Sequence, residues 1–172
     1  IKLNEEIYMN ILKIFFSILA SFLITINLYA AGSDSNSTSK IKSDYDKAIK
    51  LIKSAKKYEI DNKIKKAEKN YKKANKILIA YNKKKPGNAD ILNYLGFTTR
   101  KLGDFKNGEK YYLQGLAIEP KHVGINEYLG ELYVVTGRHN LAIERLEVLS
   151  DCNCEEYQEL KDIIAGKKVS KY

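Results

Sequence analysis

Two cysteines and two histidines are the residues of this chain best suited to redox or metal chemistry. Cys152 and Cys154 are separated by one residue, so they could form a local disulfide in a tight ring, stay as free or intermolecular thiols, or bind a soft metal such as copper(I) or zinc. A metal site would need further ligands, and neither His122 nor His139 lies at ligand spacing. We expect His139 to pack after a turn and His122 to face solvent in a loop.

The sequence contains no nucleophile motif, no glycine-rich phosphate loop and no evident pair of catalytic carboxylates. Glu127 and Glu131 lie one helical turn apart, a spacing that is routine on a solvated helix face. We therefore predict that the protein is not an enzyme and carries neither a cofactor nor a bound metal.

Length and composition describe a globular chain that can bury a real core. The 172 residues are 44% apolar and 30% charged. This composition excludes disorder of the whole chain, because a disordered chain would leave too much apolar surface exposed to water. Two prolines and ten glycines favour long helices over many short strands. Only residues 14–28 form a continuous apolar run, which excludes a membrane protein with many spans.

A charged residue, an apolar run and small residues follow one another near the N-terminus. Met9 is the only methionine, so we place the start of the protein there, followed by Lys13 and the apolar run at 14–28. This order is typical of a secretory signal peptide over residues 9–30. We expect export to the periplasm, the alternative being an uncleaved signal that anchors the chain in the membrane. The serine-rich residues 31–43 offer no apolar face and predict a flexible linker.

Residue types recur along the chain at an offset of thirty-four positions. Pro86 and Pro120 share this offset, and so do Gly103 and Gly137. The same offset relates Tyr94 to Tyr128, Leu95 to Leu129, Gly96 to Gly130, and the small residues Ala74, Gly108 and Ala142. Chance would not align prolines, glycines and core positions in one register, so the chain contains an internal repeat.

Each repeat is predicted to be a helix hairpin. Gly103 supplies a left-handed end to the first helix, and Asp104 caps the second. Small residues at Gly108 and Gly115 let the two helices approach closely. Pro120 closes the unit because it cannot donate a helical hydrogen bond.

On these residues the chain resembles the tetratricopeptide repeat family. Residues 89–122 carry the best match and residues 123–154 a good one, while residues 44–88 fit as a degenerate N-terminal repeat. Residues 155–166 have the pattern of a terminal capping helix. The motifs of the best unit are Tyr94-Leu95-Gly96, Gly103-Asp104-Phe105 and Ile118-Glu119-Pro120. The resemblance implies an all-α solenoid of tetratricopeptide-type helix hairpins with a C-terminal capping helix.

Two parts of the chain leave alternatives open within this resemblance. Residues 44–88 could instead hold one longer helix, because Lys69–Asn70 is the only candidate for a turn there. The segment 152–160 resembles the end of small exported bacterial proteins of the family, which close on two cysteines followed by Glu-Glu-Tyr. Those cysteines are spaced more widely than the pair in this chain.

By resemblance, the concave surface of such a solenoid binds peptides or helices of other proteins. This surface is lined by the first helix of each unit, with Phe97 as its apolar anchor. The residues that we expect there are Asp90, Asn93, Phe97, Arg100, Lys101, Glu127, Glu131 and Val134. The leading hypothesis is a non-enzymatic interaction module, an exported adaptor or scaffold for other envelope proteins.

Charge is distributed very unevenly along the chain. Residues 40–85 carry 17 lysines against 5 acidic residues, a net charge of +12, whereas residues 86–172 carry 11 basic and 13 acidic residues. The lysines could form a solvated face or bind anionic lipid or polysaccharide. Nucleic acid is a poor candidate, because its readers rely on arginine and the chain has 27 lysines but 3 arginines. The lysine-rich half makes an envelope-surface binder one alternative function. The other alternative is a small metal or redox carrier that uses Cys152 and Cys154.

Overall fold

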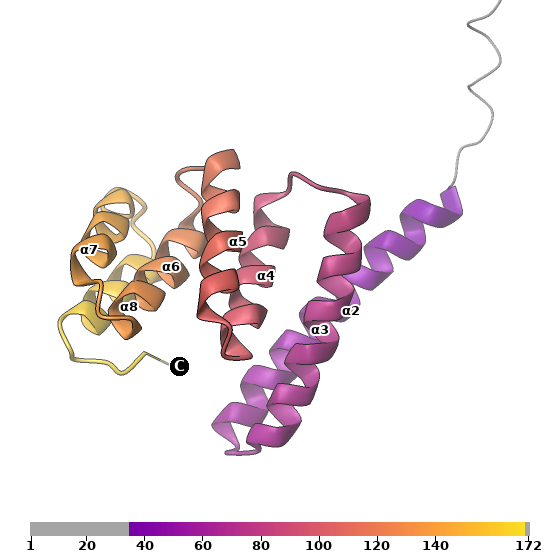
Figure 1. Ribbon diagram of the computed structural model, residues 1–172, viewed down its shortest axis with the longest axis horizontal. Coiled ribbons are helices and arrows are strands. Elements are labelled where there is room, and N and C mark those ends of the chain that lie inside the picture. The colour runs from indigo at the N-terminus through magenta and orange to yellow at the C-terminus, as the bar shows by residue number, and fades with distance from the viewer. Residues whose placement is uncertain (1–34, 171–172) are drawn as a thin grey trace, which may run out of the picture. The chain divides into compact units, whose positions relative to one another are not determined.

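Seven helices and no strand make up the part of the chain that the computed structural model describes, residues 35–170, with side chains described from residue 44 onward (Figure 1). The helices are α2 (Ser35–Ile60), α3 (Ile64–Lys84), α4 (Ala89–Lys101), α5 (Phe105–Ile118), α6 (Val123–Val135), α7 (His139–Val148) and α8 (Glu155–Ile164). The predicted all-α fold of helix hairpins is confirmed for these residues. The signal peptide predicted for residues 9–30 lies outside them.

Helix α2 begins at Ser35, within the stretch 31–43 for which the composition predicts a flexible linker. Residues 35–43 are helical in the structure. The physical reason is cooperative: once the amphipathic segment from Asp44 onward is helical, each further residue extends the helix by one hydrogen bond without a new nucleation step. The chain divides into the units 1–39 and 40–172, and the hairpins described below belong to the second unit.

The turn between α2 and α3 lies at residues 61–63. Asn62 adopts a left-handed φ of 55° there, a conformation that asparagine tolerates better than most other residues. The turn expected at Lys69–Asn70 is therefore wrong, because both residues lie inside α3, where the Asn70 amide donates to the Ser54 hydroxyl of α2 at 3.1 Å. Residues 44–88 form a two-helix hairpin whose turn lies closer to the N-terminus than the sequence indicated.

The two central hairpins, α4–α5 and α6–α7, end their first helices at the glycines of the repeat. Gly103 and Gly137 have φ values of 88° and 75°, which glycine adopts without a steric cost. The carboxylate of Asp104 then caps α5 by accepting a hydrogen bond from the backbone N–H of Asn107 at 3.1 Å. The glycines that recur at an offset of thirty-four residues therefore form the turns of the two central hairpins.

Close helix contacts explain the glycines in the middle of α4 and α6. A Cβ on Gly96 would lie 2.4 Å from the ring of Tyr112, and a Cβ on Gly130 would lie 2.5 Å from the side chain of Leu160. Tyr112 and Leu160 are fully buried, so each glycine leaves room for a large core side chain of a following helix. Leu160 thereby docks α8 against α6, and the two helices lie side by side in Figure 1.

No helix in the described part of the chain is both long and apolar enough to cross a membrane.

Candidate functional site

The hairpins surround a cleft of about 680 Å³. Its walls come from the end of α2, the first residue of α3, and the helices α4, α6 and α8. The lining residues are Lys56, Glu59, Ile60, Ile64, Phe97, Lys101, Glu127, Tyr128, Glu131, Glu155, Glu156 and Glu159. The first helices of the three hairpins (α2, α4 and α6) supply most of them, as the expected concave surface would.

Aromatic rings form the buried base of the cleft. Phe97 is only 3% exposed, and its ring centroid lies 5.2 Å from that of Tyr128 and 5.8 Å from that of Tyr71. Lys56 reaches over this base from α2, with Nζ 4.6 Å from the Phe97 centroid and donating to the Tyr128 hydroxyl at 3.2 Å. Because an ammonium group is attracted to the face of an aromatic ring, this base can hold a cation.

The rim of the cleft carries two apolar side chains that face solvent. Ile60, at the end of α2, is 86% exposed, and Ile64, at the start of α3, is 57% exposed. Isoleucines are usually buried in monomeric proteins, and an exposed pair beside an aromatic cleft is typical of a contact surface.

Carboxylates dominate the wall of the cleft that α6 and α8 build. Glu127 and Glu131 project from α6, and Glu155, Glu156 and Glu159 from the first turns of α8. We call these five residues the acidic wall. The opposite side, from α2 and α4, is mixed in charge, since Lys101 forms an ion pair with Glu59 at 2.5 Å.

Glu127 is a carboxyl group of the acidic wall with a strongly raised pKa. It is 9% exposed and makes no hydrogen bond or ion pair with any described residue. Burial, followed by the negative charges of Glu131, Glu156 and Glu159, raises its pKa to about 8, whereas Lys56 acts in the opposite direction. Like charges and desolvation both disfavour the ionised form, so this carboxyl group is poised to gain from an added cation.

Arg100 lies behind the cleft instead of facing it. Its side chain is buried at 2% exposure; Nη1 donates to the carbonyl of Tyr128 at 2.6 Å, and Nη2 pairs with Glu131 at 3.4 Å. The guanidinium group therefore fastens α4 to α6 and holds one carboxylate of the acidic wall in place. A substitution of Arg100 would lower the stability of the fold, so its effect on binding could not be read separately.

The structure brings together half of the residues predicted for the groove. Phe97, Lys101, Glu127 and Glu131 line the cleft. The other four, Asp90, Asn93, Arg100 and Val134, do not. Asp90 contacts His122, Asn93 is buried beside Gly124, and Val134 packs against the core cluster that α4 to α7 share.

The two histidines have the opposite roles to those expected from the sequence. His122 is not a solvated loop residue, because it caps α6: its Nδ1 accepts from the backbone N–H of Ile125 at 3.1 Å, and its Nε2 lies 3.2 Å from Asp90. His139 does not pack in the core, because as the first residue of α7 it is exposed. Neither histidine lines the cleft.

Sequence reasoning missed the residues that α2, α3 and α8 contribute to the cleft. Lys56, Glu59, Ile60 and Ile64 flank a turn that no glycine marks, so nothing in the sequence showed that they come together. In α8 a partial signal was present: Glu156 and Glu159 lie one helical turn before the buried Leu160 and Ile163, on the side of the helix that packs. The sequence did not show which surface these glutamates would face, because that depends on how α8 packs on α6.

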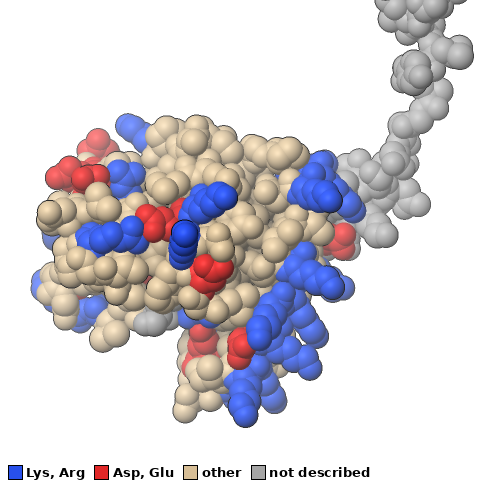
Figure 2. Space-filling model, in the orientation of Figure 1, with Lys and Arg blue, Asp and Glu red and all other residues tan. Residues whose placement is uncertain are grey.

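A second charged surface, in which lysines predominate, covers the hairpin of α2 and α3. Figure 2 shows blue side chains gathered over this part of the molecule. Along α3, Lys65, Lys69, Lys72 and Lys76 are exposed on the side opposite to the buried residues of that helix. We call these four residues the lysine face.

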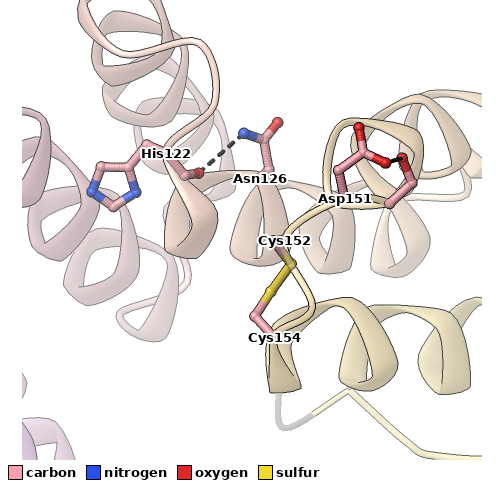
Figure 3. The surroundings of a disulfide bond; sticks show 6 residues. His122, Asn126, Asp151, Cys152 and Cys154 are labelled. Carbon is pink, nitrogen blue, oxygen red and sulfur yellow. Dashed lines mark hydrogen bonds between the residues drawn. A yellow bond between two sulfur atoms is a disulfide. The ribbon is translucent and has the colours of Figure 1, made fainter.

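A disulfide joins Cys152 to Cys154 at the point where the chain leaves α7 and begins α8 (Figure 3). Cys154 is the N-cap residue of α8, which places the bridge next to the first carboxylates of the acidic wall. Because both sulfur atoms are bonded to each other, neither is a thiolate ligand in this state. Within the described residues, no group of three or more histidine, cysteine or acidic side chains could hold a metal ion.

No family model matches the chain, and no curated protein matches it. Among solved structures, the chain is similar to one described as the Arabidopsis OM64 TPR domain, with a TM-score of 0.46 and 13% sequence identity. The similarity covers 73% of this chain and 99% of that domain.

Proposed function

We propose that the chain is a non-enzymatic binding module, an exported adaptor or scaffold that holds a segment of a partner protein in the cleft. One observation carries the proposal: the cleft joins an aromatic base to the exposed isoleucines Ile60 and Ile64 and to a dense acidic wall. An apolar anchor surrounded by charged residues is the usual anatomy of a protein contact. Export is part of the proposal and is supported by the apolar run at 14–28.

Site-specific crosslinking tests this proposal. A photoreactive phenylalanine analogue would replace Ile60 in the full chain, and irradiation in an extract of the source cells would be followed by mass spectrometry. The matched control carries the same analogue at Leu113, which is 48% exposed on α5 and does not line the cleft. We expect a discrete crosslinked partner from position 60 only, and its loss when Ile64→Ser is added. Identical products from both positions would contradict the proposal.

A second candidate function has its own observation, the lysine face on α3. Four exposed ammonium groups on one side of a helix suit an anionic lipid or polysaccharide surface. In this reading the molecule binds the envelope through the α2–α3 hairpin and does not require the cleft. Its binding would be weakened by salt, whereas an apolar contact in the cleft would persist.

A further inference from the structure

Acidic side chains outnumber basic ones along the lining of the cleft. Six glutamates line it against two lysines, Lys56 and Lys101. Lys101 is paired with Glu59, and Glu131 with Arg100 behind the wall. The acidic wall therefore presents a negative potential to anything that binds in the cleft.

The buried carboxyl group of Glu127 indicates which chemical group a ligand would place in the cleft. It is nine-tenths buried, lines the cleft and contacts no hydrogen-bond donor among the described residues. Because this carboxyl group faces the cleft, a ligand that supplies a donor there adds a hydrogen bond to it. An ammonium or guanidinium group would provide both the donor and the opposite charge.

The chain's own lysines show how the cleft accommodates cations. Lys56 lies over the ring of Phe97 at the base. At the other side, Lys168 forms an ion pair with Glu159, and the Ser170 hydroxyl donates to Glu131 at 3.3 Å. A short basic segment after α8 thus already contacts the acidic wall.

We propose that the occupant of the cleft is a basic segment of a partner protein, in which lysine or arginine side chains alternate with apolar ones. The basic side chains contact the acidic wall, with one of them at Glu127, and the apolar ones contact Ile60 and Ile64 at the rim. This inference rests on the proposed function and adds the chemical class of the partner. The segment at Lys168 competes with the partner for part of the wall.

Fluorescence anisotropy with synthetic peptides tests the proposal on the full chain. The probe is a fluorescein-labelled peptide in which lysine alternates with leucine, and the matched peptides carry glutamate or glutamine in place of every lysine. We expect the lysine peptide to bind at least tenfold more tightly than either of the others. The double substitution Glu127→Gln and Glu156→Gln is expected to weaken its binding by at least tenfold. Glutamine keeps the shape of glutamate and is neutral, as the Glu127 carboxyl group is below its pKa of about 8, so the fold should persist.

A matched control separates the position of the charges from their number. Glu144→Gln with Glu147→Gln removes two glutamate carboxyl groups from the exposed side of α7, outside the cleft, and should change the affinity less than twofold. Equal weakening by both double substitutions would overturn the inference, because the attraction would then be general.

The remaining outcomes distinguish this inference from the proposed function. If the glutamate or glutamine peptide binds as tightly as the lysine peptide, and Ile60→Ser with Ile64→Ser abolishes that binding, the charge preference is wrong and the cleft is still a binding site. If none of the three peptides binds, the inference is overturned, and the crosslinking experiment alone decides the proposed function.

Discussion

At the scale of single residues, Glu127 couples the acidic wall to the stability of the fold. Its ordinary pKa of 4.5 is raised to about 8 by burial and by its carboxylate neighbours. Between these two values the folded chain keeps a proton that the unfolded chain has lost. Stability therefore falls as the pH rises through this window, and the contribution of Glu127 stops changing above about pH 8.

The substitution Glu127→Gln is expected to remove this dependence. Glutamine stays neutral, so the free energy of unfolding of the variant should rise relative to wild type between pH 5 and pH 8, by at least about 1 kcal/mol, the value of a shift of one pKa unit. Urea unfolding at a series of pH values measures it, and Glu147→Gln on the exposed side of α7 is the control. Parallel pH profiles for wild type and Glu127→Gln would contradict a raised pKa.

The groove residues show how far helical spacing alone can predict a site. Consecutive helix residues point about 100° apart, so the pattern could place Phe97 and Glu127 on the open face of their helices. It could not decide between Arg100 and Lys101, which differ by one such step. The packing of α6 against α4 decides it, since it buries Arg100 against Glu131 and leaves Lys101 in the cleft.

At the scale of elements, the offset of thirty-four residues predicted the two central hairpins because glycines mark their turns at Gly103 and Gly137. No glycine marks the turn of the hairpin of α2 and α3. Its apolar residues continue at helical spacing through the turn, and Asn62 takes the left-handed conformation that glycine takes in the other hairpins. The turn was therefore not visible in the sequence, and neither was the half of the cleft that it positions.

The role of Asn62 in ending α2 leads to a prediction. Asn62→Val should destabilise the chain by about 1–2 kcal/mol, because a β-branched residue is strained at positive φ. Asn62→Gly should leave stability unchanged or slightly raised, since glycine adopts this conformation readily. Asn62 is exposed, so no packing contact confuses the comparison. Denaturant unfolding of both variants measures the effect, and equal stability of Val and Gly would show that the turn does not require a left-handed residue.

At the scale of the whole molecule, acidic and basic side chains gather on different surfaces. The acidic wall lies in the cleft, while the lysine face covers the outer side of α3. The sequence has an excess of lysine in residues 40–85, and it left open whether these lysines form a solvated face or bind an anionic surface. Only the structure shows that the glutamates collect on a separate surface, because they come from helices that are distant in sequence.

This separation allows the second candidate function to be tested without disturbing the first. Replacing Lys65, Lys69, Lys72 and Lys76 together by glutamine should weaken the binding of the full chain to vesicles of anionic phospholipid by at least tenfold at low salt, because each lysine near such a surface contributes about 1 kcal/mol. The control replaces Lys106, Lys110, Lys121 and Lys161, which are exposed outside the hairpin. Vesicle sedimentation measures both variants. If they lose equal affinity, net charge alone governs the attraction and the lysine face is a solvated surface; if only the first does, the hairpin is a docking surface distinct from the cleft, and peptide binding in the cleft should persist in that variant.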